Sequence, residues 1–70
     1  MAHKLTNMQA QRLASSTPTI PLLAKKAGVH DGTIRTAENG GAISVTDSQR
    51  IADALGVSLA TLGAVDHNGR

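Results

Sequence analysis

The side chains that could do chemistry in this chain are concentrated between residues 30 and 39. This stretch carries polar groups of several kinds: His30, Asp31, Thr33, Arg35, Thr36 and Asn39. Arg35 is the best equipped of them, because a guanidinium can fork onto guanine O6 and N7 or onto a phosphate. A histidine can also attract a phosphate when it is protonated. The stretch is therefore the first candidate for a binding site.

Catalysis has little support in the sequence. The chain contains no cysteine, which excludes disulfides, thiolate metal sites and cysteine nucleophiles. His3, His30 and His67 lie far apart in the sequence and lack metal-ligand spacing. No serine has a histidine partner in a recognisable frame, and no Gly-rich loop carries a Walker lysine. We expect no enzymatic activity, no metal or other cofactor, and no small-molecule ligand.

Length and composition limit the fold. A chain of 70 residues makes one small domain with a thin core. Because the chain has no aromatic residue, aliphatic side chains must build that core, which suits a compact bundle of short helices. The same absence removes the stacking platforms of single-strand and RNA readers. The formal net charge of +2 points only weakly to an anionic partner.

The sequence shows no membrane or secretory signal. No run of apolar residues approaches the length of a membrane span, and Met1 to Lys4 do not lead into a secretory segment. We therefore expect no membrane partner and a cytoplasmic location, in contact with the nucleoid if the partner is DNA.

A helix precedes the candidate stretch. It is predicted to begin after Thr19, a plausible cap, with Pro21 tolerated in its first turn. Gly28 supplies the left-handed residue that commonly closes a helix. The apolar residues that recur at helical spacing before it, and so predict its buried side, are Leu23, Ala24 and Ala27. A new helix is expected to begin directly after Gly28, because Val29 precedes the next cap and can pack on Ile34 as a hydrophobic staple.

A second helix is predicted from about Asp31 to Glu38, with a left-handed stop at Asn39-Gly40-Gly41. At about 100° per residue, Ile34 and Ala37 share the buried side. The outward side then holds Gly32, Arg35, Thr36 and Asn39. Two short helices joined by a Gly-containing turn are the unit with which nucleic-acid readers present a helix to the major groove.

These residues resemble the lambda-repressor-like helix-turn-helix proteins (Cro and repressor, or XRE), whose usual run is LAxxxGVSxxTIxxxENG. The matching residues are Leu23, Ala24, Gly28, Val29, Thr33, Ile34, Glu38, Asn39 and Gly40. Downstream, Ala54-Leu55-Gly56-Val57-Ser58 and Leu62 also match, so the resemblance covers roughly Pro18 to Leu62. It implies an all-α domain of about five short helices over residues 1–70, with the helix-turn-helix core at about 19–40.

The resemblance also implies a function: sequence-specific binding of double-stranded DNA by a transcriptional regulator that inserts its third helix into the major groove. Family contacts with DNA carry over onto His30, Asp31, Gly32, Thr33, Arg35, Thr36 and Asn39. The competing interpretation of Arg35 is a solvated charge that pairs with Asp31 four residues earlier. Asp31 itself suits a helix N-terminus better than a phosphate. The Glu38 carboxylate, by the resemblance, is mostly structural and does not touch bases.

The chain departs from the family pattern in two places, and these keep a second function open. Ile20 stands where members often carry a glutamine that helps to hold a phosphate, and we interpret it as a core or interface residue. Asp31 and Gly32 stand at the start of the helix that would contact bases, where they supply an acid and few side-chain atoms. The alternative is a protein-interaction module, such as an antitoxin subunit or an antagonist. We favour a small phage- or prophage-type Cro or immunity repressor that binds two half-sites as a homodimer.

Two further helices are predicted from T-x-x-Q capping boxes, at Thr6-Asn7-Met8-Gln9 and at Thr46-Asp47-Ser48-Gln49. The first of these helices is expected to form an apolar face with Met8 and Leu13, with Ala10 and Ala14 as small neighbours. The second should stop at Gly56.

A short fifth helix is expected from Ser58, with Val57 and Leu62 as its staple, because KKAGVHDGTI and DALGVSLATL share the pattern G-V-x-x-x-T. Residues 64–70 are expected to form a flexible tail. Leu59 and Val65 are candidates for a dimer contact.

Overall fold

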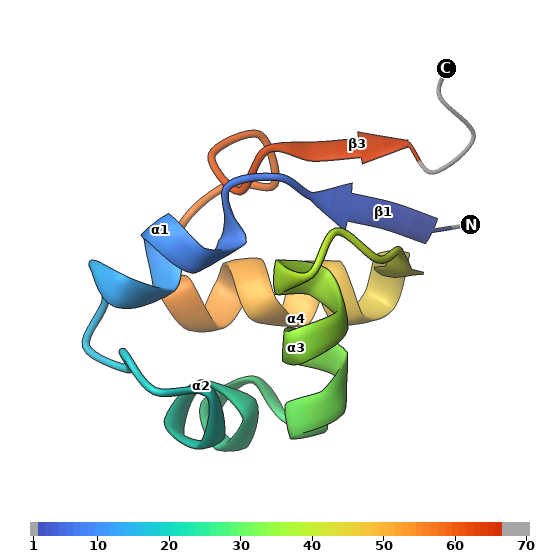
Figure 1. Cartoon of the computed structure of the whole chain (residues 1–70). Coiled ribbons are helices and arrows are strands. Elements are labelled where there is room, and N and C mark those ends of the chain that lie inside the picture. The colour runs from blue at the N-terminus through green and yellow to red at the C-terminus, as the bar shows by residue number, and fades with distance from the viewer. Residues whose placement is uncertain (1, 67–70) are drawn as a thin grey trace.

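The computed structural model describes residues 2–66 and contains four helices and a three-stranded sheet. In chain order the elements are β1 (Ala2–Leu5), α1 (Met8–Leu13), α2 (Ile20–Ala27), α3 (Asp31–Glu38), β2 (Ile43–Ser44), α4 (Val45–Leu55) and β3 (Ala64–Asp66). Figure 1 shows β1 and β3 along one side of the helices and α2 at the opposite side. None of the four helices described combines the length and hydrophobicity needed to cross a bilayer.

The sheet is the main departure from the predicted all-α fold. Its strand order is β2-β1-β3, and both pairs are antiparallel. β1 is therefore the central strand, with His3 opposite Ile43 of β2 on one side and Lys4 opposite Val65 of β3 on the other. Successive strand residues face opposite sides, so Leu5 is buried while Lys4 is exposed. Strands this short carry too little alternation to be recognised in the sequence.

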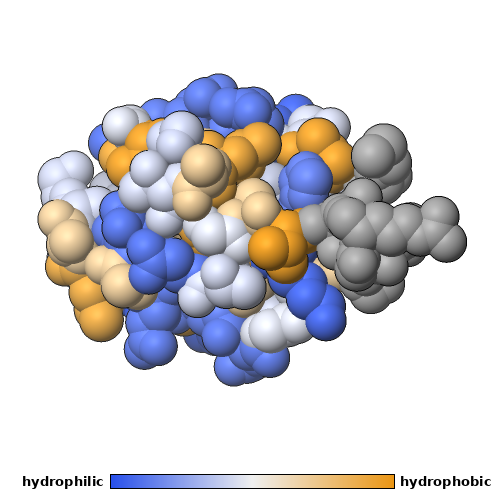
Figure 2. All heavy atoms as spheres, turned by 90° about the horizontal axis from the view of Figure 1, so that it is seen from above, coloured by the Kyte–Doolittle hydropathy of each residue, from blue (hydrophilic) through white to orange (hydrophobic). Residues whose placement is uncertain are grey.

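The outer side of the sheet is not a large apolar surface. Figure 2 looks onto this side and shows small hydrophobic areas separated by hydrophilic ones, in the part not covered by grey atoms. Val65 is 47% exposed here, whereas Leu59 is half-buried and packs against the core. Of the two predicted dimer-contact residues, only Val65 is substantially exposed.

The predicted fifth helix is wrong, because residues 59–63 form only turns. Its first turn does begin as expected, since the Thr61 amide donates to Ser58 Oγ at 3.1 Å and Leu62 is fully buried. Gly63 then adopts a left-handed conformation with φ 71°, and the chain continues directly into β3. The predicted flexible tail is therefore wrong for residues 64–66, and residues 67–70 lie outside the described part.

The predicted capping box of α1 is also wrong. The helix begins at Met8 after Asn7, which forms no side-chain capping bond. The two polar side chains reach the end of the chain instead: the Thr6 hydroxyl donates to the Gly63 carbonyl at 2.9 Å, and Asn7 Nδ2 donates to the Thr61 carbonyl at 3.0 Å. These bonds connect the start of α1 with the turn before β3.

The buried side of α1 differs from the expected one. Met8 and Arg12, four residues apart, are buried, whereas Leu13 is 58% exposed. Ala10 and Ala14 are exposed as well. The expected apolar face is therefore confirmed for Met8 and wrong for Leu13, because a charged residue, Arg12, occupies the inward position one turn after Met8.

α4 starts two residues before the position predicted from its capping box. Ser44 is the cap, and its Oγ accepts from the Asp47 amide at 3.0 Å. Gln49 donates to Asp53 four residues later, at 3.0 Å, in place of reaching back to a cap. The predicted stop at Gly56 is confirmed by a left-handed conformation with φ 69°.

The core takes aliphatic residues from nearly every element. Its buried members are Leu5, Met8, Leu23, Ala24, Ile34, Ala37, Ile43, Ile51, Ala52 and Leu62. Full burial of each larger side chain contributes roughly 1.5 to 3 kcal/mol of hydrophobic stabilisation. Leu23, Ala24, Ile34 and Ala37 lie on the predicted buried sides of α2 and α3, so the sequence-based assignment of these faces is confirmed. The opposite face of α3 is left free.

Candidate nucleic-acid interface

The turn between α2 and α3 sets the direction in which α3 leaves the core. Gly28 has φ 73°, and the Val29 amide donates to the Ala24 carbonyl at 3.0 Å, so α2 closes in the predicted left-handed way. Thr19 caps the start of α2 as predicted, accepting from the Leu22 amide at 3.4 Å. His30 is the N-cap residue of α3, but its side chain makes no capping hydrogen bond. The imidazole is exposed at the beginning of the helix.

α3 exposes most of the predicted site residues. His30, Gly32, Arg35, Thr36 and Asn39 are exposed, and Asp31 and Thr33 are half-buried. Ile34 and Ala37 hold the opposite side in the core. The face of α3 that carries the predicted contacts is therefore presented to solvent.

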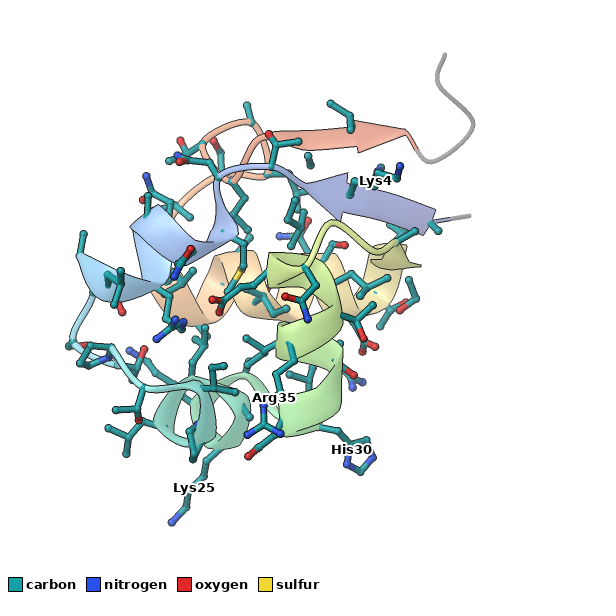
Figure 3. All side chains as sticks on the ribbon, viewed as in Figure 1. Lys4, Lys25, His30 and Arg35 are labelled. Atoms are coloured by element: carbon teal, nitrogen blue, oxygen red, sulfur yellow. The ribbon has the colours of Figure 1, made fainter. Side chains whose placement is uncertain are left out.

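Two exposed basic side chains lie at the end of the molecule where α3 begins. In Figure 3, Arg35 and His30 lie at the same end of the molecule as Lys25 of α2, whereas Lys4 lies on the sheet at the other end. Lys25 and Arg35 are both exposed. Phosphates near the start of α3 would therefore meet positive groups from two helices.

Arg35 has no ion-pair partner in residues 2–66, where Arg12 with Glu38 is the one salt bridge. The competing interpretation of Arg35 as the partner of Asp31 is thus not supported. Asp31 occupies the first position of α3 and places an acid in the first turn, where it is favourable for the helix dipole.

The far end of α3 places Asn39 away from the other predicted residues. Asn39 is the C-cap residue with φ −87°, and Gly40 supplies the left-handed stop with φ 85°. A helix of eight residues is about 12 Å long. Asn39 therefore lies about one helix length from His30, and the two residues would meet different parts of an extended ligand.

A depression of about 500 Å³ runs beside α3. Its lining residues are His30, Gly32, Thr33, Thr36, Ala42, Ile43, Ser44 and Asp47. The structure thus brings four predicted residues together with a segment that sequence reasoning missed. Residues 42–47 lie beside α3 because the chain folds back after Gly41. No local sequence pattern indicates this reversal.

The chemistry of the depression is mostly uncharged. Apart from His30 and the half-buried Asp47, its lining consists of small polar and aliphatic residues. A carboxylate repels phosphate oxygens, so Asp47 makes its side of the depression unfavourable for a phosphate. The hydroxyl and methyl groups of Thr33 and Thr36 suit an uncharged base edge better.

A buried ion pair anchors the end of α3. Arg12 is 8% exposed and forms a bidentate contact with Glu38, with Nε 2.6 Å from Oε2 and Nη2 2.9 Å from Oε1. Its Nη1 donates to the Pro18 carbonyl. The hydrogen bond to Glu38 raises the pKa of Arg12 against the opposing effect of burial. The expected structural role of Glu38 is confirmed, with a partner in α1 that sequence reasoning did not identify.

Ile20, at the start of α2, is half-buried and packs against the core. This confirms the core interpretation of its side chain. The N-terminus of α2 therefore has no side-chain amide at this position with which to hold a phosphate.

Comparison with known proteins identifies the central part of the chain. A family model described as helix-turn-helix matches residues 22–62, which is more than half of the chain. The comparisons with curated proteins and with solved structures give no match. The matched range covers nearly all of α2 and the whole of α3, β2 and α4, and leaves β1, α1 and β3 outside. The chain therefore belongs to the helix-turn-helix family of the Cro/C1 (XRE) type, a family of DNA-binding regulators.

Proposed function

We propose that this protein is a sequence-specific regulator of transcription that inserts α3 into the major groove of double-stranded DNA. The observation that carries the proposal is the exposed face of α3, which has no partner within residues 2–66 and lies at the same end of the molecule as Lys25. Positive groups beside such a face supply the sequence-independent attraction to phosphates, and the helix supplies base contacts.

Individual roles follow from the side chains. Arg35 binds guanine through its guanidinium fork, a contact that discriminates against other bases by about 1 to 3 kcal/mol. Thr33 and Thr36 contact base edges, and Gly32 allows the backbone to approach the groove closely. His30 at one end of α3 and Asn39 at the other contact the phosphates of the DNA backbone.

Two copies bind together on a pair of half-sites in this proposal. The largest dimension of the described part is 32 Å. Half-sites on one face of DNA are about 34 Å apart, one turn of the double helix. Neighbouring copies could therefore read successive turns, and pairing would multiply their affinity. The best fit is a small repressor of the phage or prophage Cro type, working in the cytoplasm.

A second function is favoured by Asp47 and Ile20. The acid on the rim of the depression and the aliphatic residue at the start of α2 both reduce the attraction of this surface for phosphates. A protein-interaction module with the same fold, such as an antitoxin subunit, would tolerate both residues. Its interface should respond little to added salt, whereas DNA binding must weaken steeply as counterions are released.

A titration separates these functions. Fluorescent duplex from a random-sequence pool and fluorescent single strand are titrated with the protein at two salt concentrations. The proposal predicts salt-sensitive duplex binding that Arg35→Ala weakens. Arg50→Ala removes the same charge from an exposed position on α4 and should weaken binding less. Absence of duplex binding even at low salt would reject the DNA function, and capture of protein partners would then be the next experiment.

A further inference from the structure

Gly41 lies directly against Thr36. The Gly41 amide donates to the Thr36 carbonyl at 2.8 Å. A β-carbon on Gly41 would lie 2.6 Å from Thr36 Cγ2 and 3.1 Å from the Thr36 carbonyl oxygen. Gly41 is not among the glycines with positive φ, so its backbone conformation is open to other residues. A side chain at position 41 would therefore displace the neighbouring threonine.

Thr36 is also placed to contact a ligand. Its side chain is exposed and lines the depression beside α3. A threonine hydroxyl in a helix often bonds to a carbonyl one turn earlier. Within residues 2–66, however, the Thr36 hydroxyl makes no hydrogen bond. The hydroxyl is thus free for a partner outside the chain, while the methyl group is close to Gly41.

We propose that Gly41 is a positioning residue for DNA recognition: it leaves room for the Thr36 methyl group and so determines how Thr36 presents its hydroxyl to a base. This inference rests on the proposed DNA-binding function. A threonine hydroxyl can donate or accept a hydrogen bond, whereas its methyl group favours the methyl group of thymine. Moving these two groups to other positions around Cβ therefore changes the preferred base.

The size of the contact indicates how the protein would respond to Gly41→Ala. The cheapest relief is rotation of the Thr36 side chain, because it lies at the surface and threonine has two accessible rotamers in a helix. The contact between the new β-carbon and the Thr36 carbonyl oxygen, at 3.1 Å, requires a shift of only a few tenths of an ångström. We expect the variant to fold with the Thr36 side chain rotated so that its Hβ faces residue 41. This rotation moves the methyl group to the former hydroxyl position and the hydroxyl to the former Hβ position.

A double-mutant cycle tests this proposal. Thr36→Ser keeps the hydroxyl and removes Cγ2, so in that background Gly41→Ala should meet only the milder approach to the carbonyl oxygen at 3.1 Å. Duplexes are selected from a randomised pool by the wild type, both single variants and the double variant, and their affinities are measured. Gly41→Ala should change the preferred base at one position of the half-site and weaken binding to the wild-type sequence about tenfold. The double variant should bind like Thr36→Ser.

Three results would overturn the proposal in distinguishable ways. Equal weakening by Gly41→Ala on every duplex, or no rescue by Thr36→Ser, would reject the positioning role while DNA binding stands. Absence of duplex binding by the wild type would reject the proposed function and the positioning role with it. Thermal unfolding of the four proteins adds a measurement without DNA, in which Thr36→Ser must relieve the destabilisation by Gly41→Ala if the two residues are in contact.

Discussion

Two segments of this molecule begin alike and end differently. The first runs from Gly28 through α3, and the second runs from Gly56 to β3. Both open with a left-handed glycine, at φ 73° and 69°, followed by a valine. Both bury an aliphatic residue six positions after the glycine, Ile34 in one and Leu62 in the other. The first segment then continues as an eight-residue helix, whereas the second makes a single turn and enters a strand.

Capping does not explain this difference. Ser58 forms a capping hydrogen bond at the start of the short turn, whereas His30 forms none at the start of α3. The decisive position comes one residue after the buried aliphatic side chain, where α3 has Arg35 and the second segment has Gly63. Gly63 turns left-handed and accepts hydrogen bonds from Thr6. A contact with the start of the chain thus ends the second segment.

The two segments are also anchored differently, and this leads to the largest predicted effect. α3 is held at its end by the buried Arg12–Glu38 pair, while the second segment is held by hydrogen bonds from Thr6 and Asn7. Glu38→Gln leaves the Arg12 charge buried without a counter-ion and should cost about 3 to 5 kcal/mol of unfolding free energy. Denaturant unfolding followed by circular dichroism measures it. Asp53→Asn, an exposed control on α4, should change stability by less than about 0.5 kcal/mol. Equal effects would mean that the ion pair does not anchor α3.

An intermediate effect is predicted at the two left-handed glycines Gly28 and Gly63. Alanine at Gly28 meets open space and should cost about 1 kcal/mol for its backbone conformation alone. Alanine at Gly63 would also collide with the Thr6 hydroxyl and approach the Asn7 amide to 3.1 Å, so we expect a cost of about 2 to 3 kcal/mol. Thermal unfolding of both variants compares them. A smaller loss for Gly63→Ala would show that the contact with Thr6 does not end the second segment.

The smallest effects are expected at the two caps. His30→Ser supplies a side-chain acceptor that α3 lacks and should stabilise the protein by about 0.5 to 1 kcal/mol. Ser58→Ala removes an existing cap and should destabilise it by about 1 kcal/mol. The same thermal measurement applies to both. If His30→Ser gives no gain, the first turn of α3 is limited by something other than its missing cap.

The sequence predicted α2 and α3 because their signals are local. Helical periodicity, the cap at Thr19 and the stops at Gly28 and Gly40 all act within a few residues, and the structure confirms each of them. The sheet could not be predicted, because its register pairs Leu5 with Ala64 at the other end of the chain. Thr6 resembled a helix cap for the same reason, since its actual partner is 57 residues away.

The candidate site also combines residues with local sequence signals and residues brought in from distant parts of the chain. Helical spacing predicted that Gly32, Arg35 and Thr36 face outward, and the family resemblance added His30, Asp31 and Thr33 to the candidate contacts. Residues 42–47 were missed because they reach α3 only after the chain folds back through Gly40 and Gly41. Arg12 was missed because an arginine in a short polar helix normally faces solvent, and its partner Glu38 lies 26 residues away. Site residues on one element are therefore accessible to sequence reasoning, while those from several elements need the fold.

The measurement that tests the central claim most directly is the change in backbone amide NMR signals of the labelled protein when short duplex DNA is added. It compares the two segments within one molecule. We predict that signals of residues 30–36 shift or broaden and that those of residues 58–63 remain nearly unchanged. Shifts confined to residues 58–63 or to the sheet, with α3 unaffected, would contradict the assignment of α3 as the helix that enters the major groove.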